Sequence, residues 1–383
     1  MKTSNLSSES STGAKTFHEG LQEPVQLFLT DMRSKFSRVP SLDGFRAVSI
    51  SIVLASHFIS ANVFPGGFGV LVFFVVSGFL ITRLLFAEAR TAGNVSLGNF
   101  YMRRIFRLYP VIVVYTLCVV AYYLATSRPI NWVEPASALF YFANYLYAYF
   151  LQIGRQATVM PFSIFWSLSI EEHFYLIFPV FFVLVRGSPS RICRGMLAVI
   201  VLCLVLRFLL AALRPDLLDT HWFYYTELRL DSIAFGVLLA GLCELDSGYR
   251  IVLEVQKGVW FWTALAILLI CFVVRIPWFR ETLRYTLQGA CVTIILAATV
   301  FSRNYRWLQR SLNWGFVRWI GILSYSLYVW HYFVLMILNK YAMPHLLEAA
   351  LGSALSVALA AASYYGLEKP SMGLRHRFGS RTV

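Results

Sequence analysis

Long apolar runs separated by short polar loops make up the chain from about residue 42 onward. Most of these runs are about 17 to 22 residues long, the length that lets a helix cross the hydrocarbon core of a bilayer. Because a span must satisfy its backbone hydrogen bonds internally, the pattern predicts an all-α fold, a polytopic transmembrane helical bundle. Eleven runs are candidates, at residues 42–61, 66–87, 108–126, 136–151, 163–185, 193–213, 228–244, 258–275, 284–302, 319–340 and 346–366.

The fourth run, 136–151, is short and rich in tyrosine, with Asn144 in its middle. It suits an interfacial or re-entrant segment as well as a full span. If it does not cross, the cytoplasmic loops and C-terminal tail hold 17 Lys and Arg against 7 outside, whereas crossing changes the split to 10 inside and 14 outside. The positive-inside rule therefore favours ten spans, with both termini in the cytoplasm, over the alternative of eleven.

Composition agrees with a membrane protein, since 58% of the 383 residues are hydrophobic and 14% are charged, against roughly a quarter charged in soluble domains. The net charge of +14 lies in loops between apolar runs, so we interpret it as a topology signal and predict no nucleic-acid partner. The six cysteines lie in or beside apolar runs and lack ligand spacing. We predict neither disulfides nor a metal site.

Three segments follow from the pattern. Residues 1–40 are expected to form a cytoplasmic tail, disordered and then amphipathic, and they lack the apolar core and cleavage site of a signal peptide. Residues 41–370 are expected to form the membrane domain, and 371–383 a basic cytoplasmic tail. The pattern makes no prediction about oligomeric state.

Charged residues inside spans are costly, which makes them functional candidates. In the first span, Arg46 and His57 are eleven residues apart, so they share a helix face about 16 Å apart along the axis. This places a cation near the cytoplasmic surface and an imidazole near mid-membrane. Asp43 lies one turn before Arg46, where it can orient the guanidinium. Arg46 can also snorkel to headgroups, and His57 can be a hydrogen-bonded structural histidine.

The stretch FWSLSIEEHFYLIFP holds two adjacent carboxylates, Glu171 and Glu172, at a depth close to that of His57. Ser167 and Glu171 share a helix face, whereas Glu172 points about 100° away. Burial away from a cation suits an acid/base role for a carboxylate, whereas an ion pair with Arg229 is the structural alternative.

Three arginines, Arg103, Arg104 and Arg107, crowd the start of the third span. Such clusters fix topology or contact anionic lipid, but their position opposite Arg46 favours binding the phosphates of a cytoplasmic donor. Further polar groups are candidates for supporting the site: Arg229 and Asp231, whose ion pair favours a structural role, and Tyr325, Tyr328 and His331.

Several stretches together resemble the membrane-bound acyltransferase 3 family, over about residues 41 to 373. The matching stretches are SLDGFRAVSISIVLASHF, FGVLVFFVVSGFLITRLL, NFYMRRIFRLYPV, FWSLSIEEHFYLIFPV, RLDSIAFG, LSYSLYVWHYFVL and GLEKPSMGL. The family's Arg-x10-His, Arg-x-x-Arg and acidic motifs fall on Arg46 and His57, Arg104 and Arg107, and Glu171 with His173. Where His173 stands, the family more often has Gln. Many members append an extracytoplasmic hydrolase-like domain, and we expect none here.

The resemblance implies an O-acyltransferase of the bacterial inner (plasma) membrane, with no bound cofactor. It would transfer an acyl group, expected to be acetyl, from cytoplasmic acyl-CoA to a hydroxyl of a carbohydrate or lipid-linked oligosaccharide acceptor. Our hypothesis is that the arginines hold the phosphates of acyl-CoA. His57, oriented by Glu171 or Asp231, would then deprotonate the acceptor hydroxyl or briefly carry the acyl group. The alternative is a proton-coupled secondary transporter using the same intramembrane His and Glu.

Overall fold

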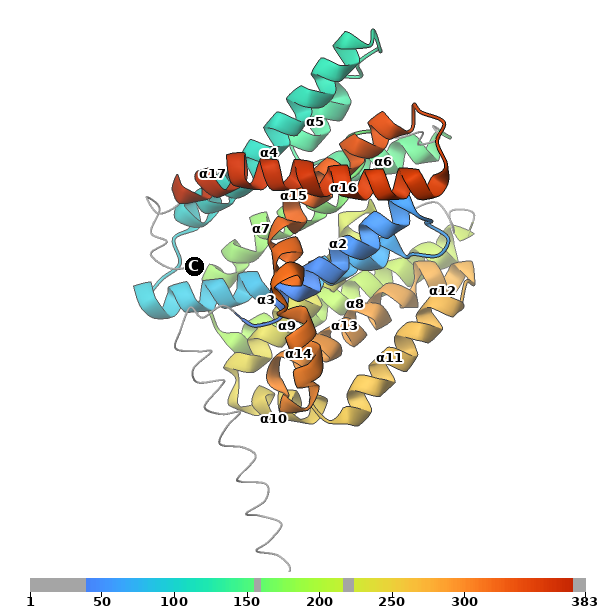
Figure 1. The fold of residues 1–383 in the computed structure, drawn as a ribbon. Helices are drawn as coiled ribbons and strands as arrows, with labels where there is room; N and C mark the ends of the chain where they lie inside the picture. Colours follow the sequence, from blue (N-terminus) through green and yellow to red (C-terminus); the bar gives the residue numbers. More distant parts are fainter. Residues whose placement is uncertain (1–38, 155–159, 216–223, 375–383) are drawn as a thin grey trace, which may run out of the picture.

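The computed structural model describes residues 39–154, 160–215 and 224–374, and every regular element in these ranges is helical. The helices pack into one bundle, which lies on its side in Figure 1. In chain order they are α2 (Leu42–Phe58), α3 (Gly66–Ala92), α4 (Leu97–Ala125), α5 (Val133–Leu139), α6 (Ala143–Gln152), α7 (Phe165–Leu184), α8 (Pro189–Leu213), η3 (Thr226–Leu228), α9 (Leu230–Glu244), α10 (Asp246–Val255), α11 (Gly258–Val273), α12 (Pro277–Glu281), α13 (Leu283–Phe301), η4 (Arg303–Tyr305), α14 (Arg306–Leu312), α15 (Gly315–Leu338), α16 (His345–Ser363), η5 (Tyr364–Glu368) and α17 (Lys369–Leu374). The all-α prediction is confirmed for the described residues.

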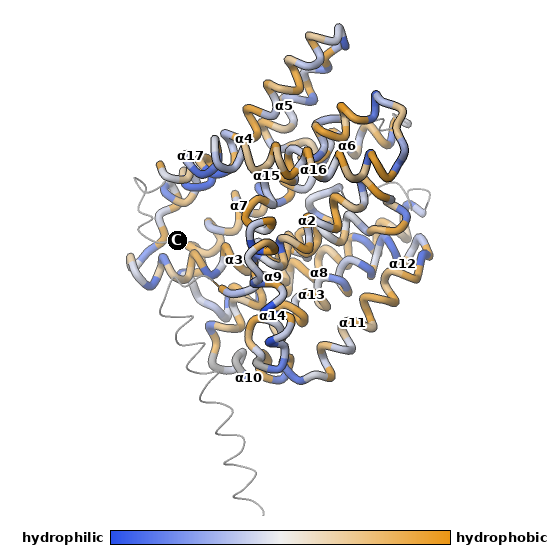
Figure 2. Tube along the Cα trace, in the orientation of Figure 1, coloured by the Kyte–Doolittle hydropathy of each residue, from blue (hydrophilic) through white to orange (hydrophobic). Residues whose placement is uncertain are grey.

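Seven helical stretches are long and apolar enough to cross a membrane: α3, α4, α7, α8, α13, α15 and the continuous stretch from α16 to α17. Hydrophobic residues follow the lengths of these helices, and hydrophilic residues gather near their ends, for example around α12 and α17 (Figure 2). The chain is therefore a membrane protein, as the apolar runs predict.

Three further predicted spans form shorter helices: α2 with 17 residues, α9 with 15 and α11 with 16. At 1.5 Å per residue they measure about 25 Å or less, slightly short of a bilayer core of about 30 Å. Two of them are shielded by protein, because α9 packs between α3 and α8, and α2 packs between α3 and α15. The count of ten spans stays a prediction.

The fourth apolar run does not form one continuous helix. It is divided between α5 and α6, and the chain turns between them at Tyr141, whose φ is 57°. Asn144, which the sequence places in the middle of the run, is fully buried and donates to Tyr224 O at 3.1 Å and to Thr226 Oγ1 at 3.0 Å. This polar contact with the η3 segment explains how an asparagine is accommodated there.

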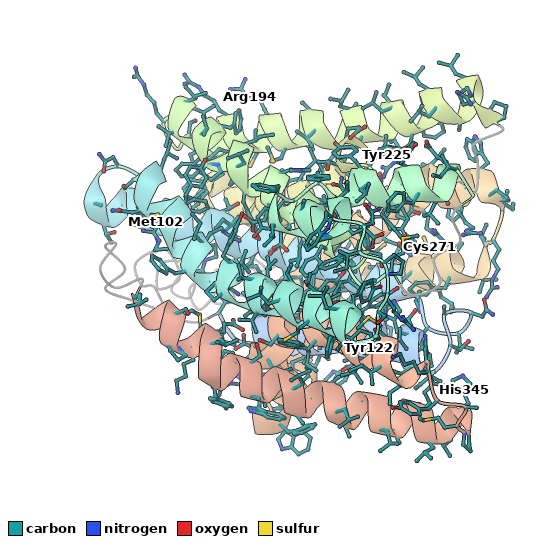
Figure 3. The ribbon with its side chains drawn as sticks, turned by 90° about the horizontal axis from the view of Figure 1, so that it is seen from above. Met102, Tyr122, Arg194, Tyr225, Cys271 and His345 are labelled. Carbon is teal, nitrogen blue, oxygen red and sulfur yellow. The ribbon has the colours of Figure 1, made fainter. Side chains whose placement is uncertain are left out.

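Successive helices place their connections at alternating ends of the bundle. Met102 near the start of α4 and Arg194 near the start of α8 lie toward one end, whereas Tyr122, Tyr225, Cys271 and His345 lie toward the other (Figure 3). The predicted ten-span topology requires such an alternation of ends.

Reporter fusions test this topology. We expect fusions placed after Arg194, Lys257 and Arg310 all to report the cytoplasm, because the loops that carry most of the Lys and Arg are retained on that side. Alkaline phosphatase and fluorescent-protein fusions provide opposite signals for each position. An extracytoplasmic signal at all three positions would instead mean that 136–151 crosses.

A close crossing of α2 and α15 sets the geometry of the bundle centre. A Cβ on Gly321 of α15 would lie 1.9 Å from the carbonyl oxygen of Asp43 in the first turn of α2. Only glycine therefore allows this backbone approach. The crossing keeps the two helices in contact along their lengths, which brings residues 274 positions apart within hydrogen-bonding distance further along.

Candidate active site

A cavity, here called the α4 cavity, lies among α2, α3, α4, α7 and α15 and has an empty volume of about 840 Å³. Its apolar wall comes mainly from α3. Its polar lining consists of Arg46, Ser77, Arg104, Arg107, Ser167, Glu171, Tyr175, Ser324, Tyr325 and Tyr328. Seven residues singled out from the sequence therefore meet in one cavity: Arg46, Arg104, Arg107, Ser167, Glu171, Tyr325 and Tyr328.

The arginines of α4 do not all face this cavity. Arg104 and Arg107 are one turn apart and both line it. The Arg104 guanidinium carbon lies 3.2 Å from the Tyr175 ring centroid, and Nη1 lies 3.5 Å from Glu172. Arg103 instead forms an ion pair with Glu88 at 2.5 Å and is absent from the lining. Only two of the three predicted donor-binding arginines of α4 are therefore placed to contact a ligand in this cavity.

Glu171 is fixed by two neighbours that the sequence analysis did not single out. Ser77 Oγ on α3 and Tyr175 OH, one turn along α7, both hydrogen-bond to Glu171 Oε1, and the two hydroxyl oxygens are 2.5 Å apart. The spacing of Glu171 and Tyr175 by four residues was a readable signal, since such residues share a helix face. Their carboxylate and hydroxyls form one wall of the α4 cavity.

A histidine pair forms a second cluster. His57 in the last turn of α2 stays exposed, whereas His331 of α15 is fully buried. His331 Nε2 lies 3.2 Å from His57 Nδ1, and each Nδ1 also lies 3.1 Å from a backbone carbonyl, that of Val53 for His57 and that of Leu327 for His331. Both histidines were candidates from the sequence, but their contact was not predicted.

These contacts fix the tautomers of the neutral pair. A carbonyl oxygen only accepts, so Nδ1 of each ring carries the hydrogen. His331 Nε2 is then the acceptor for His57 Nδ1–H, and the lone pair of His57 lies on its Nε2. His331 therefore orients His57 as a base with a free nitrogen.

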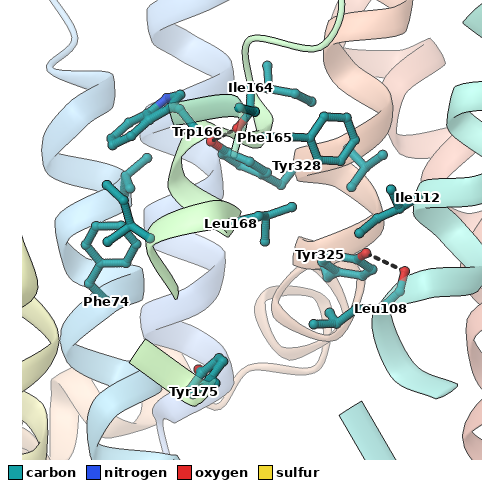
Figure 4. Packing of buried hydrophobic residues seen from close by; sticks show 14 of the residues in the cluster. Phe74, Leu108, Ile112, Ile164, Phe165, Trp166, Leu168, Tyr175, Tyr325 and Tyr328 are labelled. Carbon is teal, nitrogen blue, oxygen red and sulfur yellow. Dashed lines mark hydrogen bonds between the residues drawn. The ribbon is translucent and has the colours of Figure 1, made fainter. Parts of the chain in front are cut away.

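Tyr328 connects the histidine pair to the α4 cavity. Its ring centroid lies 5.8 Å from that of His331, and Tyr328 is also one of the residues that line the cavity. Tyr328 OH donates to Ile164 O at 2.9 Å, so Ser167 Oγ, 2.7 Å away, donates to Tyr328. One helical turn earlier, Tyr325 OH donates to Leu108 O at 2.8 Å (Figure 4). Both tyrosines of α15 are thus anchored to the helices that surround the cavity.

The predicted orienting carboxylates do not contact His57. Glu171 bonds within the α4 cavity, and Asp231 is buried with Arg207, whose Nη2 lies 2.6 Å from Oδ2. Glu171 and His57 lie at similar depths along their helices but are not in contact. Depth along a helix does not determine the direction in which a side chain points. In the described structure the partner of His57 is another histidine.

The expected pairing of Arg229 with Asp231 is replaced by the Arg207–Asp231 ion pair, which Thr286 supports with a 2.9 Å hydrogen bond. Arg207 was detectable, because it is a charge within the apolar run 193–213. The Arg229 guanidinium carbon lies 4.2 Å from the Tyr285 ring centroid instead. His173 faces away from both clusters, with Nδ1 2.8 Å from Thr226 Oγ1.

No group of three or more His, Cys, Asp and Glu within the described ranges is arranged to hold a metal ion. The site is thus built from guanidinium, imidazole, hydroxyl and carboxyl groups carried by membrane-embedded helices. Imidazole and carboxyl groups can exchange protons with a substrate, and guanidinium groups can bind its negative charge. Such a set suits the transfer of a group between two substrates.

The family model described as "Acyltransferase domain" (Acyl_transf_3) matches residues 39–365. The chain therefore belongs to this acyltransferase family, which confirms the resemblance inferred from its motifs. It is 30% identical over 320 residues to O-acetyltransferase OatA of Staphylococcus aureus strain NCTC 8325 / PS 47, and equally to OatA of strain COL; the match covers 79% of this chain and 51% of each relative. The chain thus spans about half the length of these relatives. No solved structure matches it.

Proposed function

We propose that the chain is an integral O-acetyltransferase of the bacterial inner (plasma) membrane. It would transfer an acetyl group from cytoplasmic acetyl-CoA to a hydroxyl of a carbohydrate or lipid-linked acceptor. The family and the names of the relatives support acetyl transfer to oxygen. The single observation that carries the proposal is the His57–His331 pair, which Tyr328 connects to the arginine-lined α4 cavity.

The donor is assigned to the α4 cavity because of its charge. Three arginines, Arg46, Arg104 and Arg107, line it together with one carboxylate, Glu171. Guanidinium groups bind phosphate oxygens in pairs of hydrogen bonds, and CoA carries several phosphates. Arg46 and Arg107 form no ion pair within the described part of the chain, so they are available to an anionic donor. The apolar wall from α3 suits the pantetheine arm.

The chemistry is a proton transfer coupled to thioester cleavage. His57 Nε2 takes the proton of the acceptor hydroxyl while its oxygen attacks the thioester carbonyl carbon. The new C–O bond forms, the C–S bond breaks, and the departing CoA thiolate takes the proton from the His57 imidazolium. His331 accepts from His57 Nδ1–H throughout, which holds the ring in place. In this scheme Glu171 positions Tyr175, whose ring lies against Arg104, and Asp231 balances the charge of Arg207.

Transfer by purified protein tests the proposal. In lipid nanodiscs supplied with radiolabelled acetyl-CoA and a mixture of bacterial glycans, we expect label on acceptor hydroxyls. We also expect the Arg104→Ala/Arg107→Ala variant to bind acetyl-CoA at least about tenfold more weakly, because each lost charge-assisted phosphate bond costs about 1.5–3 kcal/mol. Isothermal titration with acetyl-CoA measures this change.

Arg103→Ala is the matched control. It removes one positive charge beside Arg104, from a side chain paired with Glu88 outside the cavity, and should leave donor affinity unchanged. An equal loss of acetyl-CoA affinity in both variants would show that the arginines act only through the overall positive charge and do not contact the donor. Proton-driven uptake of a glycan without any label transfer would instead support the transporter alternative.

A further inference from the structure

A second and larger cavity, here called the α13 cavity, lies at the opposite end of the bundle from the arginines of the α4 cavity. Its empty volume is about 1670 Å³. The connection between α2 and α3, the start of α7, the end of α11, α12 and the start of α13 all contribute to its wall. The mechanism derived above does not use this cavity.

The described lining of the α13 cavity carries a large excess of positive charge. Four arginines, Arg229, Arg275, Arg280 and Arg284, face one carboxylate, Glu281. Arg229 is buried, Arg280 and Arg284 are partly buried, and Arg275 is exposed. A buried guanidinium such as that of Arg229 is unfavourable without a counter-charge. An anionic ligand would supply it.

Arg229 gives the sharpest indication. Its side chain is 1% exposed, and its Nε and Nη2 have no hydrogen-bond partner in the described structure. Buried Arg207 also leaves its Nε without a partner in the described structure, but its other two nitrogens bond to Asp231 and to Leu228 O. Arg284, whose Nε also lacks a partner there, lies over the same Tyr285 ring as Arg229, at 5.2 Å and 4.2 Å from the centroid. Arg207 also lies over this ring, at 5.6 Å, but it is paired with Asp231. The unpartnered donors of Arg229 and Arg284 are therefore the ones available to a shared anion.

The cavity also adjoins the proposed transfer site. Ser56, the neighbour of His57 along α2, lines it, and Trp166 of its wall packs edge-to-face on Phe74 of the α4 cavity at 6.5 Å between centroids. Figure 4 shows Trp166 and Tyr175 of α7 at opposite ends of the buried cluster. Trp166 and Tyr224, which pack edge-to-face with 5.1 Å between centroids, give the cavity an aromatic wall of the kind that sugars contact.

We propose that the α13 cavity binds the acceptor, and that this acceptor is an anionic carbohydrate whose carboxylate or phosphate group lies between Arg229 and Arg284. The inference rests on the proposed acetyl transfer for the identity of the ligand as acceptor. The negative group anchors the sugar, and a hydroxyl of the same or the next sugar ring reaches His57.

Binding to purified protein in nanodiscs of phosphatidylcholine tests the proposal. The probes are fluorescent trigalacturonate, fluorescent glucose 6-phosphate and fluorescent maltotriose, so that carboxylate, phosphate and neutral sugars are compared. We expect at least one anionic probe to bind at least tenfold more tightly than maltotriose. Arg284→Gln should remove at least tenfold of that affinity, and Arg284→Lys should retain most of it. Lys340→Gln, an exposed charge outside the cavity, should change nothing.

Three results would overturn the proposal. All three probes could bind equally, or neither anionic probe could bind. The third result is that phosphatidylglycerol displaces the anionic probe whereas neither unlabelled sugar does. Because the partly buried Arg284 carries the test, the result does not depend on folding of an Arg229 variant. The transfer assay is run in parallel with the same probes. Selective anion binding without acetyl transfer would refute the proposed function alone, and transfer to neutral and anionic sugars at equal rates would refute the anionic acceptor alone.

Discussion

Replacing His57 by Ala is expected to abolish acetyl transfer, reducing the rate by at least about a thousandfold, while donor affinity and folding are retained. General-base catalysis by a positioned side chain contributes about 10²–10⁴-fold, and His57 Nε2 is the nitrogen that the hydrogen bonds of the pair leave free. Single-turnover transfer from radiolabelled acetyl-CoA measures the loss, and titration with acetyl-CoA in the same preparation measures the donor affinity.

His57→Gln sharpens this experiment. Glutamine keeps a hydrogen-bonding group at the end of α2 but has no useful basicity, so it should be as inactive as alanine. His345→Ala provides the matched control, since it removes an exposed imidazole from the start of α16. Near-normal transfer by the Gln variant would show that His57 is structural, and the mechanism would then have to be built on Glu171 and Tyr175.

Replacing Asp231 by Ala is expected to destabilise the fold by about 3–5 kcal/mol, because it leaves the guanidinium of Arg207 buried without its counter-charge. Arg207→Met combined with Asp231→Leu should recover most of this loss, since an apolar pair of similar volume can replace a buried ion pair. Thermal unfolding followed by tryptophan fluorescence compares the single and double variants.

The double variant also separates structure from catalysis for Asp231. If it folds and transfers acetyl groups, the carboxylate acts only through stability. If it folds and is inactive, Asp231 has the catalytic role that the sequence analysis considered. A single variant as stable as the parent protein would refute the buried ion pair itself.

The helices and much of the lining of the α4 cavity were predictable from the sequence, for a simple reason. Span-length apolar runs and helix periodicity act within one helix, so they reveal that Arg104 and Arg107 share a face and that His57 follows Arg46 on α2. Seven of the residues chosen in this way line the α4 cavity.

Pairings between helices were not predictable in the same way. His57 and His331 are 274 positions apart, and their contact depends on how α15 crosses α2 at Gly321. Asp231 likewise forms its ion pair with Arg207 and not with Arg229 because of the rotation of α8 about its axis. The apolar pattern of that span does not determine this rotation. Side-chain partners across a membrane bundle are fixed by packing, which no local pattern encodes.

The contact between Phe74 and Trp166 has a consequence for the membrane itself. Under the proposed function the two cavities receive their substrates from opposite sides of the membrane, with the Phe74–Trp166 contact between them. A continuous water path through this contact would dissipate the ion gradients on which the cell depends. An acetyl group carries no charge and no tightly held hydration shell, so it can pass where a hydrated proton or sodium ion cannot. The proposed transfer, in which only acetyl passes and CoA stays on one side, would therefore need no water path through this contact.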